Sequence, residues 1–298
     1  MPQKVLISGV SGPIGAALLP ALIAEGYAIT RLVRVKSSGP GQIAWNPAQP
    51  LAPEQVSGFG AVIHLAGESI VGRWTKAKKR RIADSRVPAT RYLAGALAQA
   101  GQPPRVLISA SAVGYYGSRG DEILREDSPR GTGFASDLCR DWESASQAAS
   151  SAGVRVVQIR VGMVLSANGG ALPQMLPPFR MGVGGNLGNG RQWVSWIDAR
   201  DVASAVVHVI KTDSLQGPVN MVAPNPVTNA DFTKILARVL SRPAIFPMPA
   251  FAARLVFGQM ADELLLASQR VEPAKLRASG YQFKYPLLEP ALREILKP

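Results

Sequence analysis

Short apolar runs alternate with longer amphipathic stretches along the first half of the chain. The apolar runs carry Val, Ile and Leu at consecutive positions, which is typical of parallel strands that helices cover on both faces. The strands predicted from them are Lys4–Ser8, Ala28–Val33, Ala61–Leu65, Arg105–Ala110 and Val154–Val161. The helices predicted between them are Pro13–Glu25, Lys76–Ala100 and Phe134–Ser151. The alternation predicts an α/β fold with a doubly wound parallel sheet, whose ligand crevice lies at the carboxyl ends of the strands.

The pattern changes after Val161. Glycine dominates residues 182–190, so this stretch is predicted to be a loop rather than a helix or strand. Prolines break the chain after about residue 243, which predicts a tail of short helices. The elements predicted in between are a helix over Asp198–Lys211, a short strand over Val219–Val222, and a helix that Thr228 caps and that runs to about Leu240.

The first predicted strand runs into glycines at every third position. Gly9 permits a tight turn, Gly12 lets the backbone approach a pyrophosphate, and Gly15 allows the helix to pack closely on the strand. The helix N-terminus offers free N–H groups and the positive end of its dipole to phosphates. The turn therefore predicts dinucleotide binding, with an ordinary glycine-rich turn as the alternative. The predicted cofactor contacts here are Gly9, Ser11, Gly12, Pro13, Ile14 and Gly15.

The end of the second strand indicates which dinucleotide binds. Sites for NAD usually carry an Asp or Glu here, which holds the ribose 2′-hydroxyl. In this chain the segment 30–36 is basic, and no acidic residue occurs between Glu25 and Glu54. An arginine suits a 2′-phosphate, which a carboxylate would repel. We therefore predict NADP, with Arg34 as its main contact; the alternative is that the arginines here are only solvent-exposed.

The third strand ends in small residues, followed by an acid. Leu65, Ala66 and Gly67 leave room for the ribose and pyrophosphate of a cofactor near the backbone. Glu68 follows where a carboxylate could reach the crevice, and a structural role is its alternative. His64 lies within the strand, so we expect a packed core histidine rather than a catalytic one.

The fourth strand delivers Ser111 to the crevice, and Tyr115 and Tyr116 follow shortly after it. These three are the candidate catalytic residues, and we name no metal ligands. Short-chain dehydrogenases with such a glycine turn usually transfer protons with a Tyr-x-x-x-Lys pair on a later helix. No tyrosine in this chain is followed four residues later by a lysine. The cofactor site is therefore predicted to be present without the usual acid–base pair.

At this point the chain resembles the extended and atypical short-chain dehydrogenase/reductase superfamily. Within it, the chain is similar to the atypical NAD(P)-dependent epimerase/dehydratase-like proteins that carry a family-specific C-terminal segment of unknown function. The resemblance spans nearly the whole chain. The strings that carry it include Ser85-Arg86, 110–117, 140–143, 160–166, 169–172, Gly184-Gly185, 196–198, 220–224, 257–261 and 269–273.

This resemblance implies a Rossmann-type fold, NADP as the cofactor, and roles for several residues. Ser111 would hydrogen-bond the substrate oxygen, and Tyr115 or Tyr116 matches the aromatic of the superfamily's Tyr-Gly dipeptide. Phe134 and Leu138 occupy the two positions where the superfamily carries its Tyr–Lys pair. Arg81 and Arg86 would face the cofactor phosphates. The implied cofactor neighbours are Val33, Arg34, Leu65, Ala66, Arg86 and Val161.

The length of 298 residues fits one large α/β domain with a smaller lobe. We expect a dinucleotide-binding domain over 1–165, to which later segments such as 198–223 return. A smaller C-terminal substrate lobe is expected over 166–298, and it includes the family-specific tail at about 245–298. We see no internal repeat and no low-complexity linker in the chain.

Charge and cysteine content limit the partners and the compartment that the protein can have. The net charge of +13 attracts phosphates, and its densest cluster is 73–81. A solvated helix face or a cofactor contact explains this cluster better than nucleic acid does, because interleaved aromatic residues are lacking. The single Cys139 rules out an internal disulfide and suits a reducing compartment. The start does not resemble a signal peptide, and no apolar run is long enough to span a membrane. We expect a cytoplasmic monomer or homodimer.

Two functions remain open. The first is an NADP-dependent oxidoreductase or epimerase-like enzyme, in which another residue replaces the missing acid. Its substrate would be a small molecule, for example a nucleotide sugar or a carbonyl compound. The second is a non-catalytic NADP(H)-binding regulatory or redox-sensing protein.

Overall fold

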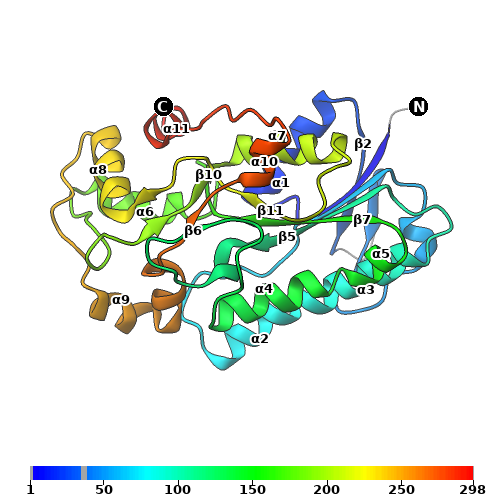
Figure 1. Ribbon diagram of the computed structural model, residues 1–298, viewed down its shortest axis with the longest axis horizontal. Coiled ribbons are helices and arrows are strands. Elements are labelled where there is room, and N and C mark those ends of the chain that lie inside the picture. Colours follow the sequence, from blue (N-terminus) through cyan, green and yellow to red (C-terminus); the bar gives the residue numbers. More distant parts are fainter. Residues whose placement is uncertain (1–2, 35–38, 298) are drawn as a thin grey trace.

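The computed structural model describes residues 3–34 and 39–297. Its centre is a seven-stranded, fully parallel sheet in the order β11-β7-β5-β4-β1-β2-β3 (Figure 1). The chain leaves β1 toward β2 and β3 on one side and returns to β4 on the other, so the switch in strand order lies between β1 and β4. The strands are β1 (Lys4–Ser8), β2 (Ala28–Val33), β3 (Gln42–Ala44), β4 (Ala61–His64), β5 (Val106–Ala112), β7 (Arg155–Val161) and β11 (Gly217–Met221).

Helices cover both faces of the sheet, which confirms the predicted doubly wound α/β fold (Figure 1). Along β1, Val5 and Ile7 join the hydrophobic cluster under one pair of helices, while Leu6 joins the cluster under the other helices. Both sides of the strand are thus buried, which is why the apolar run is continuous. One face carries α1 (Pro13–Ala24) and α7 (Ala199–Lys211); the other carries α2 (Lys76–Asp84), α3 (Val87–Ala98), α4 (Phe134–Ser144) and α5 (Gln147–Ser151).

The structure confirms the five predicted strands of the first half to within two residues and corrects two helices. The helix predicted over Lys76–Ala100 is two helices, α2 and α3, because Pro88 in the first turn of α3 lacks an N–H that could continue the preceding helix. The helix predicted over Phe134–Ser151 also divides, where the Ser146 hydroxyl donates to the backbone carbonyl of Glu143. The edge strand β3 was not predicted.

The second half of the chain adds one strand to the sheet and further helices beside it (Figure 1). Side chains of these helices form a separate hydrophobic cluster. The strand predicted over Val219–Val222 is β11, at the sheet edge. The helix predicted over Asp198–Lys211 is α7, and Asp198 caps it by accepting from the backbone N–H of Arg200. Thr228 caps the next helix, as predicted. The predicted loop over 182–190 has no helix or regular strand.

The remaining elements are short. In the part of the chain that the structure describes, three two-stranded pairs form outside the main sheet, β10 with β8, β12 with β9, and β13 with β6. Their bounds are β6 (Ile123–Leu124), β8 (Met163–Leu165), β9 (Trp193–Val194), β10 (Trp196–Asp198), β12 (Val227–Thr228) and β13 (Arg270–Val271). The helices are η1 (Pro53–Val56), η2 (Val113–Tyr116), α6 (Leu172–Arg180), α8 (Asn229–Leu240), α9 (Ala250–Phe257), the π-helix η3 (Ala261–Leu265), α10 (Ala274–Ala278) and α11 (Leu288–Ile295).

Within the described residues, no helix combines the length and the apolar character that crossing a membrane requires. The division of the chain into a domain over 1–165 and a lobe over 166–298 stays a prediction.

Candidate functional site

The turn after β1 contains glycines of two kinds. Gly9 has a φ of +77°, and a Cβ added to it would lie 2.6 Å from the carbonyl carbon of Leu65. A Cβ on Gly15 would lie 2.5 Å from the carbonyl oxygen of Gly9. The protein's own backbone therefore requires both glycines. A Cβ on Gly12 would meet nothing nearer than the Gly9 oxygen at 3.6 Å. Space is thus left at Gly12, as a pyrophosphate that lies against the backbone would need.

The N-terminus of α1 suits an anion. Gly12 is the N-cap and provides no capping side chain, and the first turn holds no acidic residue. Pro13 begins the helix, Ile14 is half-buried, and Ser11 is exposed beside them. The N–H groups of the first turn and the positive end of the helix dipole are therefore not compensated by a side chain of the turn.

The end of β4 meets this turn across the switch in strand order. Leu65 and Ala66 lie against Gly9, and both are half-buried. Below them Ser8 Oγ and His64 Nδ1 lie 2.7 Å apart in the core. Burial, with a smaller effect from the Arg86 charge, lowers the pKa of His64 to about 4. The expectation of a packed core histidine is confirmed, since His64 is fully buried.

The segment after β4 joins the basic helix α2. Glu68 accepts a hydrogen bond from Lys78 Nζ at 2.9 Å, and this bond lowers the pKa of its carboxyl. Arg81 is exposed, with its Nε 3.9 Å from Glu68 Oε1. A Cβ on Gly67 would lie 3.0 Å from the Arg86 guanidinium carbon, so any larger residue here would displace that guanidinium slightly. The Glu68 carboxylate thus neutralises part of the basic cluster beside the glycine turn.

Arg86 is a buried cation with hydrogen bonds mainly to backbone oxygens. It donates to the carbonyls of Glu68 at 2.9 Å and Ile82 at 3.2 Å, and stacks over the Trp142 ring at 5.1 Å. Burial lowers its pKa to about 10. These bonds fix the loop after β4 beside the glycine turn.

The remaining predicted cofactor residues lie at the ends of two other strands. Arg34 follows the last residue of β2 and is exposed. Residues 35–38, which include Lys36 of the basic segment, lie outside the described residues. Val161 ends β7 and is buried. All the predicted cofactor residues at strand ends thus lie at, or directly after, the carboxyl end of a parallel strand. They are the turn residues, Arg34, the segment 65–68 and Val161.

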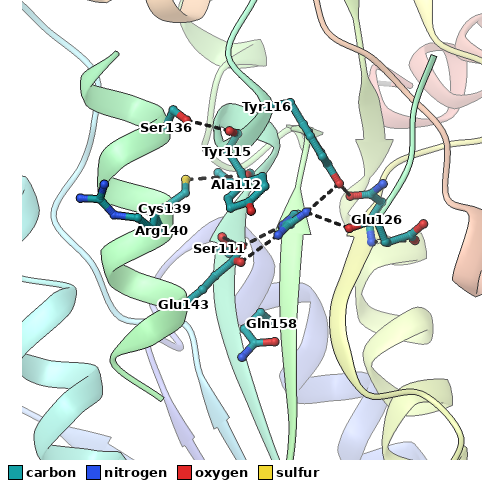
Figure 2. Close-up of polar contacts among 12 residues, drawn as sticks. Ser111, Ala112, Tyr115, Tyr116, Glu126, Ser136, Cys139, Arg140, Glu143 and Gln158 are labelled. Atoms are coloured by element: carbon teal, nitrogen blue, oxygen red, sulfur yellow. Dashed lines mark hydrogen bonds and ion pairs between the residues drawn. The ribbon is translucent and has the colours of Figure 1, made fainter. Parts of the chain in front are cut away.

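The predicted catalytic residues lie in a buried polar network (Figure 2). Ser111, near the end of β5, donates to Glu143 Oε1 of α4 at 2.7 Å. Arg160 of β7 grips the same carboxylate with its Nε and a terminal nitrogen, each at 2.9 Å. Burial is the largest single effect and lowers the pKa of Arg160, but the hydrogen bonds to Glu143, the Glu143 charge and Tyr116 together outweigh it, so the pKa is raised. The side chains of Arg160 and Glu143 are 3% and 13% exposed.

Tyr116 belongs to the same network and is fully buried. Its Oη accepts from Arg160 at 3.0 Å and donates to Asn220 Oδ1 at 2.7 Å. Burial raises the pKa of its phenol to about 12. Glu126 extends the network, because its carboxylate accepts from the backbone N–H of Asn220. Both hydrogen-bonding roles of the Tyr116 hydroxyl are thus filled within the protein.

Tyr115 differs from its neighbour. Its ring is half-buried, lies over the Arg160 guanidinium at 3.5 Å, and meets the Tyr116 ring edge to face at 5.5 Å (Figure 2). Its backbone carbonyl accepts from the Ser136 hydroxyl. Among the described residues its hydroxyl makes no hydrogen bond to the protein. Of the three candidates, Tyr115 is thus the one whose hydroxyl still has a hydrogen to donate to a ligand.

The C-terminal tail covers the positions of the superfamily's Tyr–Lys pair. Phe134 and Leu138 pack in an apolar cluster with Trp74 and with Met260 of the tail. Phe134 meets the Trp74 ring edge to face at 5.1 Å. Glu263 of η3 accepts from the backbone N–H groups of Phe134 and Ala135 at 3.2 and 2.7 Å. The tail thus caps the N-terminus of α4 and contributes to an apolar cluster. In this chain the two positions where the superfamily carries its acid and its lysine lie in that cluster.

Sequence reasoning assigned no role to Glu143, Arg160, Asn220 or Glu263. Arg160 and Asn220 carried a usable signal, because a charged or amide side chain inside an apolar strand needs a buried partner. Their partners, however, come from α4, from the segment between β5 and α4 and, for Asn220, also from Glu272 after β13, and no spacing in the sequence connects them.

Comparison with known proteins now identifies the family. A family model described as the NAD dependent epimerase/dehydratase family matches residues 5–222, and a second, of a domain of unknown function (DUF1731), matches residues 248–295. The chain belongs to the NAD-dependent epimerase/dehydratase family. The resemblance noted in the sequence, including the family-specific tail, is therefore confirmed.

Relatives in this family match nearly the whole chain. An epimerase family protein of Mycobacterium bovis is 42% identical over 97% of this chain and 96% of its own length. The crystal structure of the human epimerase family protein SDR39U1 with NADPH superimposes with a TM-score of 0.90 at 36% identity, covering 98% and 99% of the two chains. A nucleoside-diphosphate sugar epimerase from Corynebacterium glutamicum gives 0.83 at 40% identity, over 99% of this chain and 58% of that one.

Proposed function

We propose that this protein binds NADP(H) at the switch in strand order and acts as an NADP-dependent oxidoreductase or epimerase-like enzyme. The observation that carries the cofactor assignment is the space at Gly12, in a turn whose other two glycines the protein itself requires. The uncapped N-terminus of α1 adds N–H groups that fit a pyrophosphate. The NADPH in the crystal structure of the human relative supports the same assignment.

The choice of NADP over NAD rests on Arg34. The residue is exposed immediately after β2, the strand end at which a dinucleotide's adenosine ribose is held, and a guanidinium there pairs with a 2′-phosphate. We expect NADPH to bind at least about tenfold more tightly than NADH, which corresponds to one charge-assisted contact of about 1.4 kcal/mol. Fluorescence titration of both cofactors measures the ratio.

The matched variants are Arg34→Ala and Arg242→Ala. Arg242 is also an exposed arginine but lies in the C-terminal half, after α8. The preference should fall toward unity in the first variant and persist in the second. Equal affinities in the unmodified protein, or an unchanged preference in Arg34→Ala, would contradict the assignment.

For the proton donor we propose Tyr115, with Ser111 beside the reacting group. The Tyr115 hydroxyl has no partner among the described residues, whereas the Tyr116 hydroxyl is used twice. In an active assay we expect Tyr115→Phe to lower turnover by about 10²-fold, the lower end of general acid–base effects. Tyr116→Phe should mainly lower stability. A panel of nucleotide sugars and carbonyl compounds, followed by NADPH absorbance and product analysis, supplies the substrate. Unchanged turnover in Tyr115→Phe would remove this residue from the mechanism.

A second function is favoured by the apolar cluster around Phe134 and Leu138. A phenylalanine in the acid's position cannot transfer a proton, so a non-catalytic NADP(H)-binding regulator is the alternative. Tight NADPH binding, with no turnover over the whole panel and with a protein partner that copurifies, would favour this alternative. The nucleotide-sugar class heads the panel because the Corynebacterium relative is described as a nucleoside-diphosphate sugar epimerase.

A further inference from the structure

The hydrogen bond between Ser111 and Glu143 has a fixed direction. Oε1 of Glu143 accepts from Arg160 Nε at 2.9 Å, and Oε2 accepts from a terminal nitrogen of Arg160 at 2.9 Å. Both oxygens face a guanidinium, which has only N–H donors, so this carboxylate accepts its hydrogen bonds. The hydroxyl hydrogen of Ser111 therefore lies on the 2.7 Å bond to Glu143 (Figure 2).

Further contacts of Arg160 fix the orientation of the ion pair between Glu143 and Arg160. The third nitrogen of Arg160 donates to Tyr116 Oη at 3.0 Å and to the carbonyl of Glu126 at 3.3 Å. Its flat face lies 3.5 Å from the centre of the Tyr115 ring. A rotation of Arg160 would break these contacts in a site with almost no access to water. The orientation of the Ser111 hydroxyl is thus set by the whole network rather than by one bond.

A serine hydroxyl has one hydrogen to donate and two lone pairs that accept. With its hydrogen held by Glu143, Ser111 offers only lone pairs to any other group. A carbonyl oxygen placed against them finds no hydrogen to bind and meets electron density instead. A hydroxyl or an N–H placed there forms a normal hydrogen bond.

We propose that Glu143 and Arg160 hold Ser111 as a hydrogen-bond acceptor, so that the ligand group bound at Ser111 is a hydroxyl or an N–H and not a carbonyl oxygen. The proposal rests on the proposed function, in that the ligand occupies the crevice at the carboxyl end of β5. It also reverses the usual expectation for this position, where the serine donates to a substrate oxygen. Glu143 and Arg160 are positioning residues here, because they act through Ser111.

The class of substrate follows from the role of Ser111 as a hydrogen-bond acceptor. The protein loaded with NADP⁺ should recognise a secondary alcohol, such as a sugar hydroxyl, in preference to the corresponding ketone. Removing the carboxylate charge should change this preference. In Glu143→Gln the amide can donate to the Ser111 oxygen while its own oxygen still accepts from Arg160, which frees the serine hydrogen to bind a carbonyl.

The test uses matched pairs of small probes, cyclohexanol with cyclohexanone and 2-propanol with acetone. Binding to the full-length protein saturated with NADP⁺ is measured by saturation-transfer NMR. The readout is the ratio of alcohol to ketone affinity, which does not depend on the fraction of folded protein. We expect the unmodified protein to prefer alcohols by about tenfold, the effect of one hydrogen bond gained or lost.

Three variants separate the contributions. Ser111→Ala keeps the buried ion pair and should bring the ratio close to one, whereas Ser111→Thr keeps the hydroxyl and should keep the preference. Glu143→Gln should reduce the ratio below that of the unmodified protein or invert it. If Glu143→Gln does not fold, the two Ser111 variants decide the matter.

The outcomes distinguish this inference from the proposed function. NADPH titration of the same samples tests cofactor binding by itself, and loss of that binding would contradict the proposed function. With NADPH bound, a ratio near one in the unmodified protein would overturn the inference. So would a preference for alcohols that survives in Ser111→Ala, or a lack of binding by every probe.

Discussion

The two ends of the candidate site are built differently. At the glycine turn after β1, a Cβ on Gly12 would find open space, and the α1 N-terminus has no side-chain cap. At the end of β5, Ser111 and Tyr116 make their hydrogen bonds to Glu143, Arg160 and Asn220 within the protein. The first end leaves its polar groups to a ligand, whereas the second satisfies most of its own.

This difference indicates which part of the family's chemistry the chain retains. N–H groups at a helix N-terminus without a side-chain cap suit a phosphate, which we propose binds at this turn. The buried ion pair between Glu143 and Arg160, by contrast, makes its hydrogen bonds within the protein and holds β5, α4 and β7 together. The polar residues of the second end therefore contribute to stability as well as to recognition, and each end can be disturbed without the other.

The largest effect should follow from breaking the ion pair at the β5 end. Glu143→Ala leaves the Arg160 charge buried without its carboxylate, and losses of about 3–5 kcal/mol of unfolding free energy are typical of such changes. The control is Glu68→Ala at the cofactor end, which removes a part-exposed carboxylate from beside Lys78 and Arg81 and should cost much less, because water screens exposed charges. Urea unfolding measures both. Similar losses in the two variants would show that the ends do not differ in this way.

A pH effect of nearly the same size should come from the cofactor end. Burial first, and then Arg86, lowers the pKa of His64 to about 4 in the folded state, against about 6.5 when unfolded. Between these values the unfolded chain binds the extra proton, so stability falls as pH is lowered from about 6.5 to 4. The loss is on the order of 3 kcal/mol, and stability is retained above pH 6.5.

Unfolding titrations of the unmodified protein and of His64→Gln measure this contribution. The variant has no group that titrates at this position, so its stability should depend less steeply on pH over the same interval. Parallel pH profiles for the two proteins would show that His64 is charged in the folded state or is not buried.

A substitution at Gly12 should affect NADPH binding rather than folding. Gly12→Val places a branched side chain in the space left for a pyrophosphate, and we expect NADPH affinity to fall by about 100-fold, or about 2.7 kcal/mol. The thermal transition should change little, because a Cβ there meets only the Gly9 oxygen at 3.6 Å. The matched control is Gly15→Val, which should destabilise the fold, since its Cβ would lie 2.5 Å from backbone. Preserved NADPH affinity in a folded Gly12→Val protein would move the phosphate site elsewhere.

The smallest effect should come from restoring the superfamily pair. Phe134→Tyr with Leu138→Lys adds polar groups to the apolar cluster under Met260, and we expect a loss of about 1 kcal/mol, because the half-buried lysine can extend its amine toward water. Turnover should rise only if the nicotinamide lies near α4. Turnover and thermal stability of the double variant, compared with Phe134→Tyr alone, measure both effects. A large gain in rate would show that the two positions remain part of a working site.

Local patterns in the sequence were sufficient for much of this protein. The apolar runs place β1, β2, β4, β5 and β7 to within two residues, because strands buried on both faces leave a continuous apolar signal. The spacing of Gly9, Gly12 and Gly15 predicts the turn for a similar reason, since the whole motif lies within one short stretch of chain. Charge at the end of β2 likewise predicts the cofactor from neighbouring residues alone.

Only the tertiary structure decided what surrounds Ser111. Glu143, Arg160 and Asn220 come from α4, β7 and β11, and they meet because parallel strands bring their ends together across long crossovers. Tyr115 and Tyr116 are adjacent in sequence, but their hydroxyls differ in hydrogen bonding, because only the hydroxyl of Tyr116 reaches Asn220. The cap that Glu263 places on α4 spans more than a hundred residues. Hydrogen-bond partners so far apart leave no periodic signal in the sequence, because only the packing of distant elements determines which side chains meet.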